Sequence, residues 1–251
     1  MSYEAVHAVP DGATAVDEFA RVASEFGYEG VVVRNHGDAL ADFDPEAVAA
    51  RHDIDVVAGV EVRAEDPSRA SGFVGNHRDT KTVVAVHGGD PAVNRFAVEQ
   101  PAVDVLAHPM AGDGDFNHVL AREAVENDVR VEFSFERVLR ADGGRRVQAL
   151  RDLRKLGEIV EEYDVPYVTS ADPTSQRHLR SPRDLAAVAD TVGFDADLVE
   201  TGLAEWGRLA ERNRFRDSET FVEQGVYLRG ESTDAETDEG DFTDGEADDG
   251  E

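Results

Sequence analysis

Short apolar runs rich in valine alternate with segments of helical periodicity along most of the chain. In the intervening segments, apolar residues recur every three or four positions, as Val16, Phe19, Ala20, Ala23 and Phe26 do. A continuous apolar run is typical of a strand buried on both faces of a parallel sheet, and such a sheet needs crossover helices between its strands. The runs cover residues 3–9, 30–34, 55–62, 82–87, 103–108, 129–135 and 166–170.

Seven strand–helix units predict an α/β fold, a closed or nearly closed TIM-like (β/α) barrel, with residues 221–228 as a possible eighth strand. An open doubly wound sheet is the alternative. Asp44-Pro45, Asp90-Pro91 and Ser181-Pro182 each offer an N-cap followed by proline at the first helical position. Residues 65–80 contain Pro67 and Gly72 and are expected to be mostly loop, whereas residues 195–214 predict an extra C-terminal helix.

The charge is distributed unevenly. The chain carries a net charge of −29, and residues 231–251 hold eleven acids with no lysine or arginine. We therefore expect one barrel domain over residues 1–230 and an acidic disordered tail over residues 231–251. Only two lysines, Lys81 and Lys155, accompany this acid excess, which favours adaptation to molar salt over binding of a basic partner. The absence of cysteine excludes disulfides and thiolate zinc sites, and no run is apolar enough to span a membrane, so a cytoplasmic protein is expected.

Ionisable side chains follow or close several of the expected strands. Because active sites of parallel barrels lie at the carboxyl ends of the strands, these residues are candidate ligands for zinc, iron or manganese: His7, His36, Glu61, His87, His108 and Asp172. The layout resembles the polymerase-and-histidinol-phosphatase (PHP) family of metal phosphoesterases, which implies such a hydrolase. However, His7-Ala8-Val9 and Asp172-Pro173-Thr174 each lack one histidine of that family's pattern. The simpler interpretation is that no metal binds and hydrogen bonds satisfy these histidines.

A second resemblance covers residues 3–214. The carrying stretches are Gly30-Val31-Val32-Val33-Arg34-Asn35, Asn94-Arg95-Phe96-Ala97-Val98-Glu99, Asn117-His118-Val119-Leu120-Ala121-Arg122-Glu123-Ala124 and Leu179-Arg180-Ser181-Pro182-Arg183-Asp184-Leu185. In this order and spacing they resemble the ribonuclease P protein family that comprises archaeal component 3 and the eukaryotic 30-kDa subunit, itself built on a barrel similar to the PHP barrel.

That resemblance implies a subunit of the ribonucleoprotein that removes the 5′ leader from precursor tRNA. It implies that the RNA subunit performs the chemistry with Mg²⁺, and that this chain binds no cofactor and supplies no catalytic residue. The implied partners are ribonuclease P RNA, a small ferredoxin-like protein subunit and the other protein subunits. A PHP-like phosphoesterase remains the alternative, and a binding protein with neither catalysis nor RNA is a third hypothesis.

Basic residues are concentrated in the later part of the barrel, where residues 129–185 contain eleven of the 25 lysines and arginines. Arg137 to Arg146 flank Gly143-Gly144, which is expected to form a mobile loop after the sixth strand, and a second group follows the seventh strand. Arginine suits phosphate because its planar fork donates two parallel hydrogen bonds. We therefore expect RNA phosphates to be bound by Arg137, Arg140, Arg145, Arg146, Arg177, Arg180 and Arg183. Pairing with Asp142, Asp152 and Asp184 on a solvated surface is the alternative.

Large apolar side chains on the expected helices belong either to the core or to a surface that meets a partner. The helical stripes place Phe19, Phe26, Val147 and Leu150 in the core. Trp206 lies in the expected C-terminal helix, where it fits either the core or a surface that meets a partner.

Overall fold

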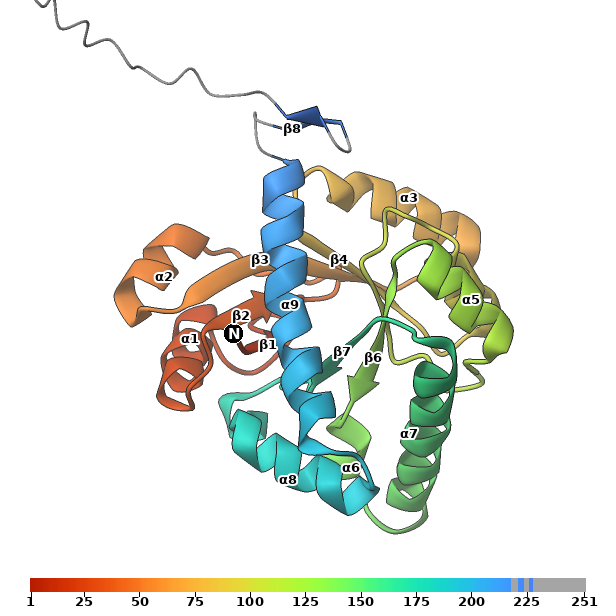
Figure 1. The fold of residues 1–251 in the computed structure, drawn as a ribbon. Coiled ribbons are helices and arrows are strands. Elements are labelled where there is room, and N and C mark those ends of the chain that lie inside the picture. The colour runs from red at the N-terminus through yellow and green to blue at the C-terminus, as the bar shows by residue number, and fades with distance from the viewer. Residues whose placement is uncertain (218–220, 224–225, 228–251) are drawn as a thin grey trace, which may run out of the picture.

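Seven parallel strands form one sheet in which each strand pairs with the next along the chain (Figure 1). The computed structural model describes residues 1–217, 221–223 and 226–227. The strands are β1 (Tyr3–Val6), β2 (Gly30–Val33), β3 (Asp55–Val62), β4 (Val83–His87), β5 (Val105–Ala107), β6 (Arg130–Ser134) and β7 (Tyr167–Ser170). Each of the seven expected runs therefore contains a strand, and most strands are shorter than predicted.

Helices connect and cover these strands, as a barrel requires. They are α1 (Val16–Glu25), α2 (Pro45–His52), α3 (Pro67–Arg78), α4 (Pro91–Val98), α5 (His118–Glu126), α6 (Glu136–Arg140), α7 (Gly143–Tyr163), α8 (Pro182–Val192) and α9 (Ala196–Arg216), with a 3₁₀ turn at Gln176–His178. Asp44, Asp90 and Ser181 cap α2, α4 and α8 by accepting backbone N–H groups, as the Asp-Pro and Ser-Pro pairs predicted.

The sheet is a nearly closed TIM-like barrel. Within the described residues, β7 and β1 form no ladder, but the gap is crossed by bonds from His7 N to Pro173 O (3.0 Å) and from Ser170 Oγ to Ala5 O (3.3 Å). The expected eighth strand is wrong: β8 (Phe221–Glu223) and β9 (Val226–Tyr227) pair with each other as a separate antiparallel sheet. The acidic tail and the predicted domain boundary at residue 230 lie outside the described residues.

Helix α9 covers β1 and β7, the two strands that border the gap in the barrel. It contacts β1 and β7 and lies across them (Figure 1). The contact is close because Gly202 and Gly207 lack side chains: a Cβ would lie 2.1 Å from Thr169 Oγ1 at Gly202 and 2.8 Å from the Tyr3 ring at Gly207. Among the described helices, none is long and apolar enough to cross a bilayer.

Ion pairs fix α9 to the strand ends that it crosses. Arg212 Nη2 lies 2.8 Å from Asp104 Oδ1, and Arg214 Nη1 lies 2.8 Å from Asp55 Oδ2. Earlier in the helix, Glu205 Oε1 accepts a bond from Arg130 Nε at 2.9 Å. The C-terminal helix predicted from the sequence is therefore an integral part of the barrel and not an appendage.

The barrel interior has two layers, which follow from the period-two alternation of the strands. The layer toward the amino ends is apolar and consists of Tyr3, Ala5, Val32, Val57, Val83, Ala85, Val105 and Val168, together with Trp206, Leu209 and Ala210 of α9. Toward the carboxyl ends of the strands, the inward faces instead carry charged and polar groups such as Arg34, Glu61 and Ser170. Trp206 is fully buried, which settles the open question in favour of the core.

Three local predictions were wrong. Residues 67–78 form α3, because Asp66 accepts from Arg69 N and Pro67 occupies the first turn, while Ala70 and Val74 are buried one helical turn apart. Gly143-Gly144 is not a loop but the start of α7. Phe26 and Val147 are 40% and 49% exposed, because the buried stripe of α7 runs through Ala149 and Leu153 and because Phe26 follows the end of α1.

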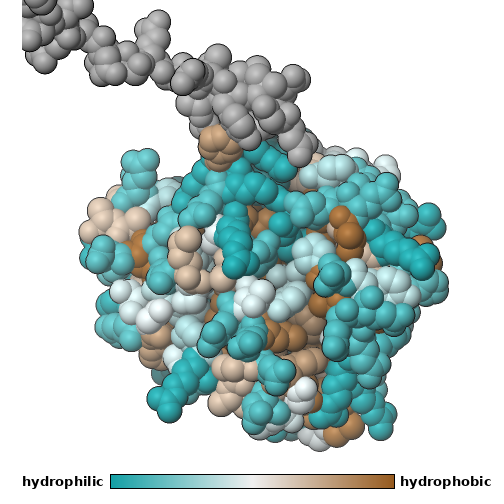
Figure 2. Space-filling model, in the orientation of Figure 1, coloured by the Kyte–Doolittle hydropathy of each residue, from teal (hydrophilic) through white to brown (hydrophobic). Residues whose placement is uncertain are grey.

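The outer surface is largely hydrophilic. On the face seen in Figure 2, polar side chains predominate and apolar ones appear in small separate patches. A dense polar and acidic shell on a valine-rich core agrees with the salt adaptation expected from composition.

Candidate functional site: the polar centre and the basic surface

The carboxyl ends of the strands bring all six candidate ligands into one polar centre. His7 follows β1, His36 follows β2, Glu61 and His87 lie on β3 and β4, and His108 and Asp172 follow β5 and β7. The imidazole rings form a row, with centroids 4.7 Å apart for His7 and His36 and 4.8 Å apart for His87 and His108. The sequence prediction that these residues meet at one rim is correct in its geometry.

Three further charged residues, which the sequence-based prediction omitted, complete the centre. Asp11 Oδ2 accepts bonds from His7 Nδ1 (2.8 Å), His36 Nδ1 (2.7 Å) and the His36 backbone N–H (2.9 Å). Arg34, directly after β2, and Glu132, in the middle of β6, are both buried. Both continue the inward alternation of their strands, Arg34 two residues after Val32 and Glu132 two after Arg130, and that spacing was the signal for them.

The guanidinium of Arg34 lies among three carboxylates. Its Nη1 is 3.0 Å from Glu61 Oε2, and its Nη2 is 2.5 Å from Glu132 Oε1 and 3.0 Å from Asp172 Oδ1. Although burial opposes ionisation, Arg34 and neighbouring histidines hold the pKa of Glu61 and of Asp172 well below the ordinary range. Glu61 and Asp172 are therefore charged at neutral pH, and the guanidinium of Arg34 is a counter-ion that they share.

Two histidines of the centre are held in the protonated form. Burial alone would lower the pKa of His7, but the hydrogen bond with Asp11 and the adjacent carboxylates of Asp172 and Glu61 outweigh it and raise that pKa to about 11. Burial likewise opposes protonation of His108, whereas Glu132 and Asp172 raise its pKa to about 9. A protonated imidazole does not ligate a metal, so in this state both rings act as hydrogen-bond donors.

Because His108 is held protonated, the folded protein is expected to lose stability as the pH becomes alkaline. The pKa of His108 rises from an unfolded value near 6.5 to about 9, so its contribution is complete below about pH 6.5 and is lost as the pH rises through about 9. We expect the free energy of unfolding to fall by on the order of 2–3 kcal/mol between about pH 7 and pH 9.5. Urea unfolding at constant molar salt measures this, and His108→Gln should flatten the curve. An equally steep decline in that variant would contradict the assignment.

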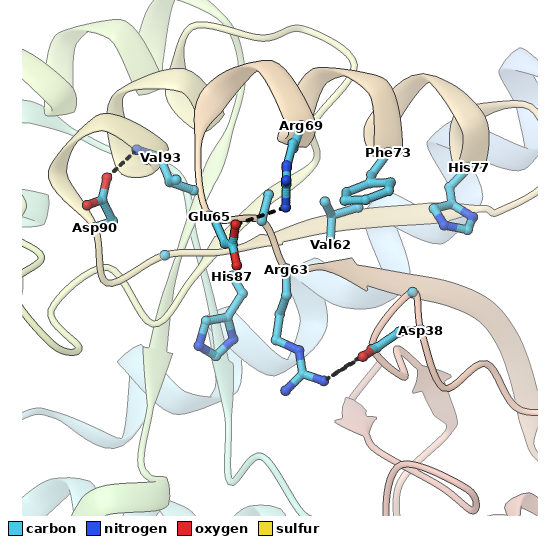
Figure 3. A pocket seen from close by; sticks show the side chains of 13 residues that line it. Asp38, Val62, Arg63, Glu65, Arg69, Phe73, His77, His87, Asp90 and Val93 are labelled. Atoms are coloured by element: carbon cyan, nitrogen blue, oxygen red, sulfur yellow. Dashed lines mark hydrogen bonds and ion pairs between the residues drawn. The ribbon is translucent and has the colours of Figure 1, made fainter.

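A cavity of about 590 Å³ adjoins the centre at His87. Figure 3 shows Arg69, Phe73 and His77 extending from α3 on one side and Arg63 reaching Asp38 on the other. Arg63 Nη2 lies 3.1 Å from Asp38 Oδ1, and Arg69 Nη1 lies 2.8 Å from Glu65 Oε2. Both arginines of the cavity are thus neutralised by acids, which makes it a poor site for phosphate.

The arginines expected to bind RNA lie elsewhere, on α6, the start of α7 and the segment after β7. Arg140 Nη2 donates to Asp172 O at 2.7 Å, and Arg180 Nη1 donates to Leu179 O at 2.8 Å. Burial and then the guanidinium groups of Arg140 and Arg180 lower the pKa of His178. The bond from Arg140 to Asp172 O ties α6 to the segment that follows β7.

The remaining members of the basic group differ in exposure. Arg137 Nη1 lies 3.1 Å from Asp152 Oδ2, as the alternative interpretation expected. Arg145 is paired loosely with Asp142 at 3.6 Å and is 83% exposed, and Arg146 Nε donates to Ala141 O at 2.8 Å. Arg177 and Arg183 are exposed, and no acid pairs with either within the described residues.

Solved structures with the same architecture confirm the fold class. A chain titled "Molecular Engineering of Organophosphate Hydrolysis Activity from a Weak Promiscuous Lactonase Template" superposes with a TM-score of 0.51 at 13% identity, over 83% of this chain and 95% of that one. A chain from "cryo-EM structure of archaeal Ribonuclease P with mature tRNA" superposes with a TM-score of 0.77 at 24% identity, over 92% of this chain and 99% of that one. Together, the fold and the site define a TIM-like barrel protein in whose polar centre Arg34 is the shared ion-pair partner of three buried carboxylates.

Comparison of sequences identifies the family of this chain, which the fold alone does not. The family described as "RNase P subunit p30" matches residues 4–218. Ribonuclease P protein component 3 of Haloarcula marismortui is 58% identical, over 93% of this chain and all of that protein, and that of Natronomonas pharaonis is 59% identical, over 94% and 98%. The protein of the same name from Methanosarcina mazei is 40% identical, over 90% and 95%. The chain belongs to the ribonuclease P subunit p30 family and is a protein subunit of ribonuclease P.

Proposed function

We propose that this subunit binds ribonuclease P RNA through a basic surface formed by α6, the start of α7 and the segment after β7. The exposed side chains of Arg145, Arg146, Arg177 and Arg183 contact phosphates directly. The partly buried Arg137, Arg140 and Arg180 hold the backbone of that surface in place through their internal bonds. The observation that supports this proposal is the hydrogen bond from Arg140 Nη2 to Asp172 O at 2.7 Å, which ties α6 to the segment after β7.

In this proposal the chemistry belongs to the RNA subunit, which uses Mg²⁺ to remove the 5′ leader of precursor tRNA. This chain contributes no catalytic residue and binds no cofactor of its own. Its protein partners are a small ferredoxin-like subunit and the other protein subunits of the holoenzyme, and its location is the cytoplasm. Recognition is of phosphate backbone and RNA shape, since the sequence contains no RNP aromatic pattern, KH loop or zinc finger with which to read bases.

Reconstitution tests the function as a whole. The RNA and the full set of protein subunits are combined in molar salt with or without this chain, and leader removal from precursor tRNA is followed across Mg²⁺ concentrations. We expect omission to lower the rate or to raise the Mg²⁺ requirement. Identical Mg²⁺ profiles with and without the chain would refute the proposal.

The arginine surface has its own test. Arg177→Ala combined with Arg183→Ala removes two exposed cations that have no acidic partner within the described residues. The slope of log Kd against log salt for RNA binding should fall by roughly one unit for each phosphate that the variant no longer binds. Arg21→Ala is the control, because the Arg21 side chain is 43% exposed but is paired with Glu18 and Glu25. Equal slopes for the double variant and the control would exclude these residues from the interface.

A further inference from the structure

The centre of the barrel contains the carboxylate and imidazole groups of a metal site, but the guanidinium of Arg34 lies among them. Carboxylate oxygens of Glu61, Glu132 and Asp172 surround the guanidinium of Arg34 at 2.5 to 3.0 Å, Glu61 at Nη1 and the other two at Nη2. Arg34 is fully buried, and its Cζ lies 5.5 Å from the centroid of the Trp206 ring beneath it. The side chain is therefore fixed between the carboxylates above and the apolar layer below.

The groups around that point are ligand types that divalent transition metals accept. His7 Nε2 lies 3.2 Å from Asp172 Oδ1, and His108 Nε2 lies 3.4 Å from Asp172 Oδ2. Within the described residues, the buried oxygens Glu61 Oε2 and Glu132 Oε2 accept no hydrogen bond of good geometry and retain lone pairs for a cation. Carboxylate and imidazole together suit zinc and manganese.

These residues nevertheless do not fit a metal while Arg34 is present. An ion among the three carboxylates would have to share their oxygens with a guanidinium that is already within bonding distance of each. Two like charges at such separation in a buried site repel strongly. The metal implied by the resemblance to phosphoesterases therefore conflicts with the side chain that the chain itself places there.

We propose that the guanidinium of Arg34 is a covalently attached substitute for a divalent cation, and that its removal converts the barrel centre into a transition-metal site. Arg34 neutralises the carboxylates as an ion would, but it offers no open coordination position at which a water could be activated. The natural barrel is accordingly kept assembled and hydrolytically inert by the same residue. This inference concerns the centre alone and does not depend on the RNA surface.

The experiment compares metal binding by the full chain and its variants. Metal-free wild type, Arg34→Ala and Arg34→Ala/Glu132→Gln are titrated with Zn²⁺ and with Mn²⁺ in isothermal calorimetry, and retained metal is counted by elemental analysis after desalting. We expect Arg34→Ala to retain one ion per chain and wild type to retain none at this point. The double variant should bind about 10–100-fold more weakly than Arg34→Ala, because a ligand is removed.

Glu132→Gln also separates the inner site from the outer histidines. Ligand atoms of His36, Glu61 and His87 lie within 4.8 Å of one another and form a second candidate group that does not include Glu132. Zinc held by that outer group would bind wild type and the double variant equally, and finding only such binding would overturn the proposal. Wild-type binding that Glu132→Gln abolishes would overturn it as well.

A folding measurement covers the case in which Arg34→Ala does not fold alone. Arg34→Met, which restores most of the missing volume, is refolded with and without Zn²⁺ and followed by far-UV circular dichroism. We expect Zn²⁺ to raise the Tm of Arg34→Met and EDTA to reverse the increase, with wild type unaffected by either. If Zn²⁺ changes the Tm of neither Arg34→Ala nor Arg34→Met, the proposal that Arg34 stands in for a metal ion is refuted.

Discussion

Trp206→Ala is expected to lower the free energy of unfolding by about 3–5 kcal/mol, the range for removing a large aromatic side chain from a core. Trp206 is fully buried at the amino-end layer of the barrel, and its Nε1 donates to Thr169 O at 3.0 Å. Its ring also forms the surface on which the Arg34 guanidinium rests. Truncation therefore creates a cavity, leaves a buried carbonyl unpaired and withdraws support from the polar centre.

The measurement is urea unfolding in fixed molar salt, followed by circular dichroism because Trp206 is the single tryptophan of the chain. Trp206→Phe keeps most of the volume and removes the N–H donor, so it should cost about 1–3 kcal/mol. Arg208→Ala, on the same helix at a side chain that is 59% exposed, should change stability by less than about 0.5 kcal/mol. A decrease for Trp206→Ala no greater than that of Arg208→Ala would show that α9 does not support the barrel.

The order of the strands and the meeting of the rim residues could be predicted because they follow from local patterns. Continuous valine runs indicate buried parallel strands, and the carboxyl ends of such strands must share one rim. His7, Glu61 and His87 were therefore placed correctly from the sequence alone. The sequence therefore predicted the polar rim, but not the ion pairs that stabilise it.

The counter-ions could not be predicted because their role depends on partners distant in sequence. Arg34 meets Glu132 across 98 positions and Asp172 across 138, and each appears in the sequence only as an isolated charge at the end of or within an apolar run. A test of period-two continuation along each strand would have placed Arg34 and Glu132 in the interior. It would not have shown that the arginine points to the focus of three carboxylates.

The errors on helices also have physical causes. Pro67 and Gly72 suggested a loop, but Pro67 fits the first turn after the cap at Asp66, and the burial of Ala70 and Val74 outweighs the low helix propensity of Gly72. The periodicity of Val147 continues the stripe of α7 into its first turns, where the side chain stays exposed. Periodicity identifies a face of a helix, whereas tertiary packing decides how much of that face is buried.

Glu61→Gln is expected to lower the free energy of unfolding by about 3–5 kcal/mol, the cost of removing one partner from a buried charge network. Glu61 is fully buried, with Oε2 3.0 Å from Arg34 Nη1 and Oε1 2.5 Å from His87 Nδ1. Glutamine preserves the shape but presents an N–H₂ group to neighbours that are themselves donors. The variant therefore loses a counter-ion of Arg34 and adds a donor with no acceptor.

Glu65→Gln is the matched control, since Glu65 is four residues away, is 84% exposed and pairs with Arg69 at 2.8 Å. Removing that surface pair should cost less than about 1 kcal/mol. Both variants are unfolded in urea at pH 7 and tested in the reconstituted holoenzyme at a temperature where each is folded. Coincident unfolding curves would contradict a buried network at Glu61. A large decrease in stability with unchanged leader removal would show that the polar centre maintains the fold and takes no part in leader removal.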